Sequence, residues 1–63
     1  MNDVIRIDFA DGGHLWIAAG TPQAAVELYD DPELTRMYHA GELTFVEMRT
    51  ADVPAGADIF RGK

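Results

Sequence analysis

The sequence predicts an α+β fold class in which a three-stranded antiparallel sheet carries two short helices on one face. Three observations lead to this prediction. Residues 4–19 alternate between apolar and polar side chains around a glycine turn, two capping residues stand before prolines in mid-chain, and residues 43–50 alternate again. With 63 residues and no cysteine, the chain is expected to form a single compact domain (residues 1–63) of marginal stability.

The first two strands are expected to form a β-hairpin. In residues 4–10 the side chains of Ile5, Ile7 and Phe9 fall on one face, because successive side chains of a strand point to opposite faces. Residues 11–13 (Asp-Gly-Gly) indicate the turn, since glycine adopts the positive φ that tight hairpins need.

The second strand of the hairpin is expected in residues 14–19. Its alternation places Leu15 and Ile17 on the core face and His14 and Trp16 on the opposite face. Trp16 is then either covered by the C-terminal segment or exposed as an aromatic anchor for a partner.

Two helix starts follow the hairpin. Thr21 stands before Pro22 and Asp31 before Pro32, and this order suits an N-cap residue followed by the first helical position. Gly41 is a natural C-terminal stop. The sequence therefore predicts two short helices, or one helix broken at Pro32.

A third strand is expected in residues 43–50. Its alternation is imperfect because Phe45 and Val46 are both apolar, which indicates either a strand covered on both faces or a bulge. The first strand is the most apolar and is expected in the centre of the sheet. The expected core consists of Ile5, Ile7, Phe9, Leu15, Ile17, Val26, Leu28, Leu34, Met37, Phe45 and Met48.

Residues 52–63 are expected to form a loosely packed C-terminal tail. Proline, glycine and three alanines interrupt any periodic pattern there. Ile59 and Phe60 are apolar enough to dock back onto the domain.

The negative charge is concentrated in one part of the chain. The sequence holds 11 acids and 5 bases, a net charge of −6, which disfavours direct binding to nucleic acid or to an anionic membrane. Residues 7–35 contain six acids and no base and so account for the whole net charge. Four of these acids stand close together: Glu27, Asp30, Asp31 and Glu33.

This cluster has two interpretations. The acids can be a solvated helix junction in which they cap helices and keep the protein soluble. They can also form an acidic binding face, because carboxylates a few ångströms apart resemble a row of phosphates and steer association with a basic surface. Asp8 and Asp11 would extend this face if the hairpin lies beside the helices.

The sequence offers little for catalysis. It has no cysteine and no serine, and no local pattern marks a threonine as a nucleophile. His14 and His39 stand far apart without cysteines, which is a poor match to a zinc site, and the glycine turn is no phosphate cradle. We therefore expect no enzyme, no catalytic residues, no cofactor and no metal.

The base-free segment 7–35 and the cluster at Glu27, Asp30, Asp31 and Glu33 carry a resemblance to a known class. The chain resembles small, acidic, cysteine-free inhibitors encoded by phages, among which anti-CRISPR proteins are the leading group, several of them DNA mimics. The resemblance implies a non-enzymatic inhibitor that binds the basic DNA-binding groove of a nucleic-acid-binding complex, of the type I CRISPR Cascade kind, and blocks DNA access.

An alternative function uses another surface. The chain can be a small interaction module, an antitoxin-like partner or a homodimer, that binds through the sheet face around His14 and Trp16 or through an open edge strand. A small enzyme subunit completed by another chain is a third possibility.

The start of the chain and its hydropathy bear on location. The first three residues are not the basic start of a signal peptide, and no apolar run approaches the roughly 20 residues of a membrane span. We expect a cytoplasmic protein, in the host cell cytoplasm if it is phage-encoded, that acts as a monomer or homodimer on a protein partner.

Overall fold

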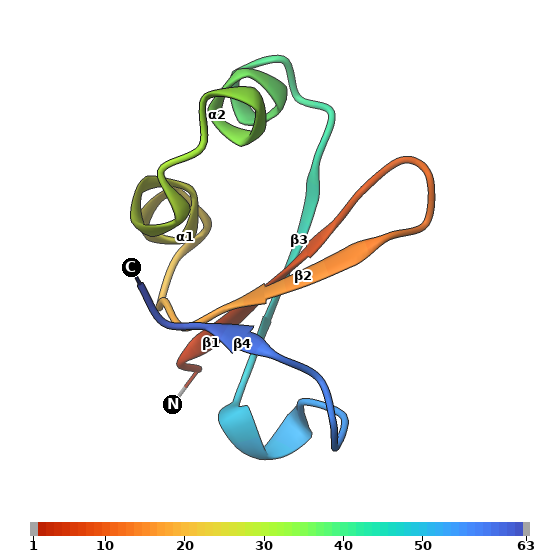
Figure 1. The fold of residues 1–63 in the computed structure, drawn as a ribbon, viewed down its shortest axis with the longest axis vertical. Helices are drawn as coiled ribbons and strands as arrows, with labels where there is room; N and C mark the ends of the chain where they lie inside the picture. The colour runs from red at the N-terminus through yellow and green to blue at the C-terminus, as the bar shows by residue number, and fades with distance from the viewer. Residues whose placement is uncertain (1, 63) are drawn as a thin grey trace.

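The computed structural model describes residues 2–62. Along the chain the elements are β1 (Val4–Asp8), β2 (His14–Ile17), α1 (Pro22–Tyr29), α2 (Pro32–His39), β3 (Thr44–Met48), one 3-10 turn (Thr50–Asp52) and β4 (Ile59–Phe60). The strands form one sheet in the order β3-β1-β2-β4, and both helices lie on one face of it (Figure 1). The α+β class predicted from the sequence is therefore confirmed.

The sheet has four strands of mixed direction, so the prediction of three antiparallel strands is partly wrong. β1 is internal, as predicted, and runs antiparallel to both β2 and β3. β4 pairs in parallel with β2, which places Trp16 beside Ile59 and Ile17 beside Phe60. The Ala18 N–H donates to the Phe60 carbonyl at 2.8 Å. Two residues are too few to show an alternating pattern, so the sequence indicated a tail where the structure has a strand.

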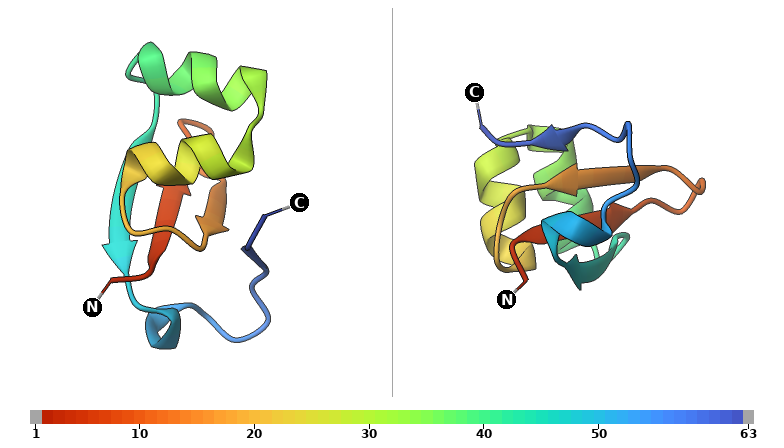
Figure 2. Two further views of the ribbon diagram at one scale, coloured as in Figure 1. Left: turned by 90° about the vertical axis from the view of Figure 1, so that its left-hand side faces the viewer. Right: turned by 90° about the horizontal axis from the view of Figure 1, so that it is seen from below.

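Two connections cross the sheet on opposite faces. Residues 18–43, with the helices, link β2 to β3 over one face, whereas residues 49–58 link β3 to β4 across the other (Figures 1 and 2). The Asp3 carboxylate fastens the second connection, because it accepts hydrogen bonds from the Thr50 backbone N–H at 2.8 Å and the Thr50 hydroxyl at 2.7 Å. Both faces are covered at this end, while the hairpin tip projects away from the helices (Figure 1).

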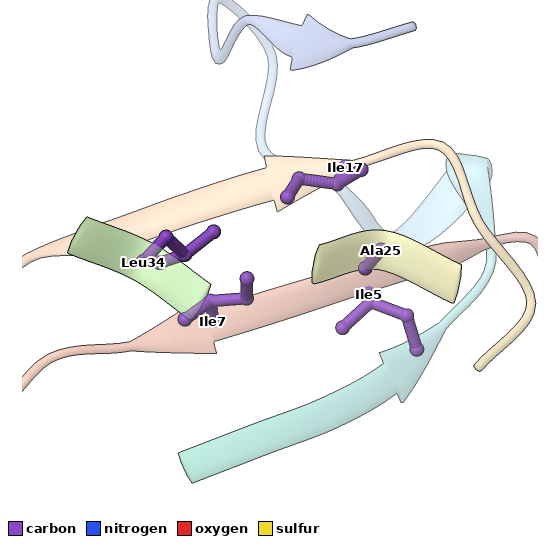
Figure 3. Close-up of a cluster of buried hydrophobic side chains, with 5 residues drawn as sticks. All are labelled: Ile5, Ile7, Ile17, Ala25 and Leu34. Carbon is purple, nitrogen blue, oxygen red and sulfur yellow. The ribbon is translucent and has the colours of Figure 1, made fainter. Parts of the chain in front are cut away.

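The core lies between the helices and the sheet. It is formed by Ile5, Ile7, Ile17, Ala25 and Leu34, all of which are buried (Figure 3). Burial of an isoleucine or leucine side chain contributes roughly 1.5–3 kcal/mol. Three strand residues and two helix residues therefore supply much of the apolar contact that holds the layers together.

Several predictions about the core need correction. Leu28, expected inside, is 38% exposed, because α1 packs Ala25 and Tyr29, four residues apart, against the core. Val4, which is not among the expected core residues, is fully buried on the opposite face of the sheet, because residues 49–58 cross that face. Met48, which pairs with Val4, is half-buried on this second face.

Both predicted helix starts are confirmed. The Thr21 hydroxyl accepts a hydrogen bond from the Ala24 N–H at 3.2 Å, and the Asp31 carboxylate accepts one from the Leu34 N–H at 3.0 Å. Asp30, with a left-handed φ of 54°, ends α1. The chain therefore forms two separate helices that lie side by side in opposite directions (Figure 2).

β3 is a regular strand. It pairs with β1 residue by residue from Thr44 to Met48. The structure therefore contradicts the bulge that the sequence offered as one alternative for this strand. Phe45 contacts the ring of Tyr38 in α2, with ring centroids 5.6 Å apart, and Val46 lies on the opposite face beside Arg6. Both apolar residues are half-buried. Within residues 2–62, no helix is long and apolar enough to cross a membrane.

Candidate partner-binding surface

Four of the predicted acids lie on the helix pair, close to the junction between α1 and α2. We call Glu27, Asp30, Asp31 and Glu33 the helix-junction acids, since they lie at the end of α1 and the start of α2. Asp31 is half-buried and the other three are exposed. The helices hold a single Lys or Arg residue, Arg36. The helix layer is therefore acidic on its exposed side.

Two helix-junction acids stabilise the start of α2. Asp31 is the N-cap of α2, and its main-chain carbonyl also accepts a hydrogen bond from the Thr35 hydroxyl at 3.0 Å. Glu33 lies in the first turn of α2, where the helix dipole favours a negative charge. The Glu33 carboxylate pairs with Arg36 at 2.7 Å, and this hydrogen bond lowers its pKa. Arg36 also lies 3.6 Å from Glu42.

The other two acids are placed where helix electrostatics disfavours them. Glu27 and Asp30 lie at the C-terminal end of α1, where the helix dipole is negative, and the last turn of α1 holds no base. The Glu27 carboxylate accepts one hydrogen bond, from the Gln23 amide at 3.1 Å. Folding of α1 gives no reason for a negative charge at Glu27.

Asp8 and Asp11 do not join the helix-junction acids. Asp8 lies on the sheet face away from the helices, where it accepts two hydrogen bonds from the Arg6 guanidinium at 2.8 and 2.9 Å. His14 Nδ1 lies 2.8 Å from the same carboxylate. The bonds from Arg6, and then that from His14, lower the pKa of Asp8. Asp11 lies in the hairpin turn and accepts from the Gly13 N–H at 2.9 Å.

The alternative surface around Trp16 is partly covered. Trp16 pairs with Arg6 of β1 on one side and with Ile59 of β4 on the other, and it is half-buried. Its ring meets the exposed ring of His14 edge-on, with centroids 5.9 Å apart. The indole Nε1–H is buried and has no hydrogen-bond acceptor among residues 2–62. The C-terminal segment thus covers part of this face and leaves the rest open.

A groove between the two helices was not predicted. It has a volume of about 490 Å³, and its lining comes from one side of α1 and the end of α2: Gln23, Val26, Glu27, Tyr38 and His39. We call it the α1–α2 groove. The spacing of its three α1 residues, i, i+3 and i+4, placed them on one helix face, but only the antiparallel packing brings the α2 residues opposite them. A smaller hollow of about 250 Å³ is lined by Tyr29, Asp30, Asp31 and Phe60.

Neither the described residues nor the comparisons assign a chemistry to these sites. No group of three or more His, Cys, Asp or Glu residues in the described part of the chain is arranged to hold a metal ion. No protein-family model, curated protein or solved structure matches this chain.

Proposed function

We propose that this chain is a non-enzymatic inhibitor that binds the basic DNA-binding groove of a nucleic-acid-binding complex and blocks DNA access. A type I CRISPR Cascade complex is the kind of partner proposed. The observation that supports the proposal most is the position of Glu27 at the negative end of α1. Negative charge there opposes the helix dipole, so the fold alone does not account for it.

The physical basis of the inhibition would be charge complementarity. A surface that seats DNA presents lysines and arginines to phosphates. The helix-junction acids present carboxylates on neighbouring turns, with Arg36 held by Glu33 at 2.7 Å. Complementary charge speeds association and suppresses wrong partners, and its contribution falls with ionic strength. We therefore expect competition with DNA that weakens as salt is raised.

The test compares two double variants with equal changes of charge. Glu27→Lys with Asp30→Asn alters the helix junction, and asparagine tolerates the left-handed φ of residue 30. Glu47→Lys with Asp58→Asn is the matched control, because both residues are exposed and lie outside the helix pair, Glu47 in β3 and Asp58 just before β4. DNA displacement from purified Cascade complexes is followed by fluorescence anisotropy.

The expected result is a loss of displacement of roughly tenfold in the helix-junction variant and a smaller effect in the control. Circular dichroism of each variant checks that the fold is retained. Equal losses in the two variants would mean that total charge matters and the helix junction does not. Undiminished displacement by the helix-junction variant would overturn the proposal.

A second candidate function rests on Trp16. Its indole N–H is buried without an acceptor, and the exposed ring of His14 continues the same face of the sheet. A partner strand or loop, in a homodimer or an antitoxin-like complex, would pack on the open part of this face around His14 and the Trp16 ring. Light scattering of the protein and of a Trp16→Ala variant tests this candidate. A monomeric mass at all concentrations would count against the homodimer.

A further inference from the structure

We propose that the α1–α2 groove receives an arginine side chain of the basic partner. This inference rests on the proposed function for the existence of a basic partner, and it names the contact at the centre of that interface. The groove volume of about 490 Å³ falls within the range of about 300–1,000 Å³ typical of ligand sites. Its lining combines one carboxylate, two rings, an amide and an apolar side chain.

The carboxylate is held in position for such a contact. The Gln23 amide donates to Glu27 Oε2 at 3.1 Å, which fixes the orientation of the group on the helix surface. Among residues 2–62, no lysine or arginine forms an ion pair with Glu27. Glu27 therefore keeps its capacity to accept from a guanidinium, which matches a carboxylate with two parallel hydrogen bonds.

The aromatic residues favour arginine over lysine. The rings of Tyr38 and His39 are 5.5 Å apart and both line the groove. The ring of Phe45 packs edge-on against the ring of Tyr38, with centroids 5.6 Å apart. A planar guanidinium stacks on such rings, whereas an ammonium is a strongly hydrated point charge. Val26 at the base of the groove suits the apolar stem of the arginine side chain.

The position of the α1–α2 groove next to the helix-junction acids is a further reason to expect an arginine there. The groove shares Glu27 with the helix-junction acids, so a cation drawn toward that surface meets the groove at its edge. Interfaces concentrate binding energy where an aromatic or arginine anchor fills a pocket surrounded by a polar rim. The remaining helix-junction acids would form part of that rim.

The experiment uses the whole chain and a defined probe. The blocked tripeptides acetyl-Gly-Arg-Gly-amide and acetyl-Gly-Lys-Gly-amide are titrated into ¹⁵N-labelled protein, and backbone amide shifts are recorded. We expect saturable shifts centred on the five groove residues with the arginine peptide and weaker ones with the lysine peptide. Glu27→Gln should weaken arginine binding by roughly fivefold, while the matched variant Glu47→Gln should leave it unchanged.

Each outcome decides the proposal separately from the proposed function. Shifts scattered over all acidic residues, equal binding of the two peptides, or an unchanged affinity in Glu27→Gln would overturn the arginine groove. If these results came with intact DNA displacement by the protein, the proposed function would stand without the groove. Groove-centred shifts in a protein that displaces no DNA would keep the arginine groove and overturn the proposed function.

Discussion

Replacement of Glu27 by lysine is expected to make the protein more stable while it weakens partner binding. Glu27 lies at the C-terminal end of α1, where positive charge is favoured. A favourable charge at a helix end contributes typically 0.3–1 kcal/mol, and Glu27→Lys removes an unfavourable charge as well as adding a favourable one. Loss of the exposed Gln23–Glu27 hydrogen bond offsets a few tenths of a kcal/mol. The net gain in the free energy of unfolding is therefore about 0.5–1 kcal/mol.

Thermal unfolding followed by circular dichroism at low ionic strength measures this gain. For a domain of this size, about 1 kcal/mol corresponds to a rise in Tm of roughly 4–8 °C, so an increase of about 2–8 °C is expected. Added salt should shrink the increase, because screening weakens charge–dipole interactions at the surface.

Glu33, at the N-terminal end of α2, provides a control, because the helix dipole disfavours positive charge there. Glu33→Lys places a positive charge in the first turn of α2 and removes the ion pair with Arg36, so it should lower Tm. A loss of stability in Glu27→Lys, or a change of the same sign in both variants, would show that the charge of residue 27 does not act through the dipole of α1. The acid at residue 27 would then have a structural role, and the main support for the proposed function would be gone.

Three further predictions concern the fold. Leu34→Ala should lower the free energy of unfolding by about 2–5 kcal/mol, because Leu34 is only 3% exposed. Leu28→Ala should lower it by less than about 1 kcal/mol, because Leu28 is 38% exposed. Urea unfolding followed by Trp16 fluorescence measures both changes. Asp31→Ala should cost about 1 kcal/mol in the same assay through loss of the N-cap, and an unchanged midpoint would contradict that role. The pKa of Asp8 is lowered in the folded state, so the Asp8 carboxylate adds to the free energy of unfolding above the ordinary pKa of 3.8, and this contribution is lost as the pH falls through the lower folded pKa. The difference in stability between the protein and Asp8→Asn should therefore vanish in acid. A constant difference from pH 7 to pH 2 would argue against the pairing of Asp8 with Arg6 and His14.

Local structure was largely predictable because its causes are close together in sequence. Thr21 and Asp31 accept from N–H groups three residues ahead, so the capping residues and the prolines after them mark both helix starts. The hairpin register follows from alternation around a short glycine turn. β1 was correctly placed inside the sheet because its apolar character indicates burial.

The errors concern contacts between segments distant in sequence. β4 is a strand because Ile59 and Phe60 meet β2, about forty residues earlier, and nothing in a two-residue segment records that partner. Val4 is buried by a connection that crosses the second face of the sheet. Leu28 is exposed because the rotation of α1 about its axis is set by packing against the sheet.

The candidate site also combines features set by neighbouring residues with features set by contacts between distant segments. The position of the negative charge along the chain and the capping role of Asp31 follow from the sequence alone, because both depend only on neighbouring residues. The separation of Asp8, which pairs with Arg6 on the face of the sheet away from the helices, from the acids of the helix pair depends on tertiary packing. The α1–α2 groove also depends on it, because antiparallel packing brings the end of α2 beside α1. Which side chains share a surface depends on how the layers pack, and packing is a property of the whole chain.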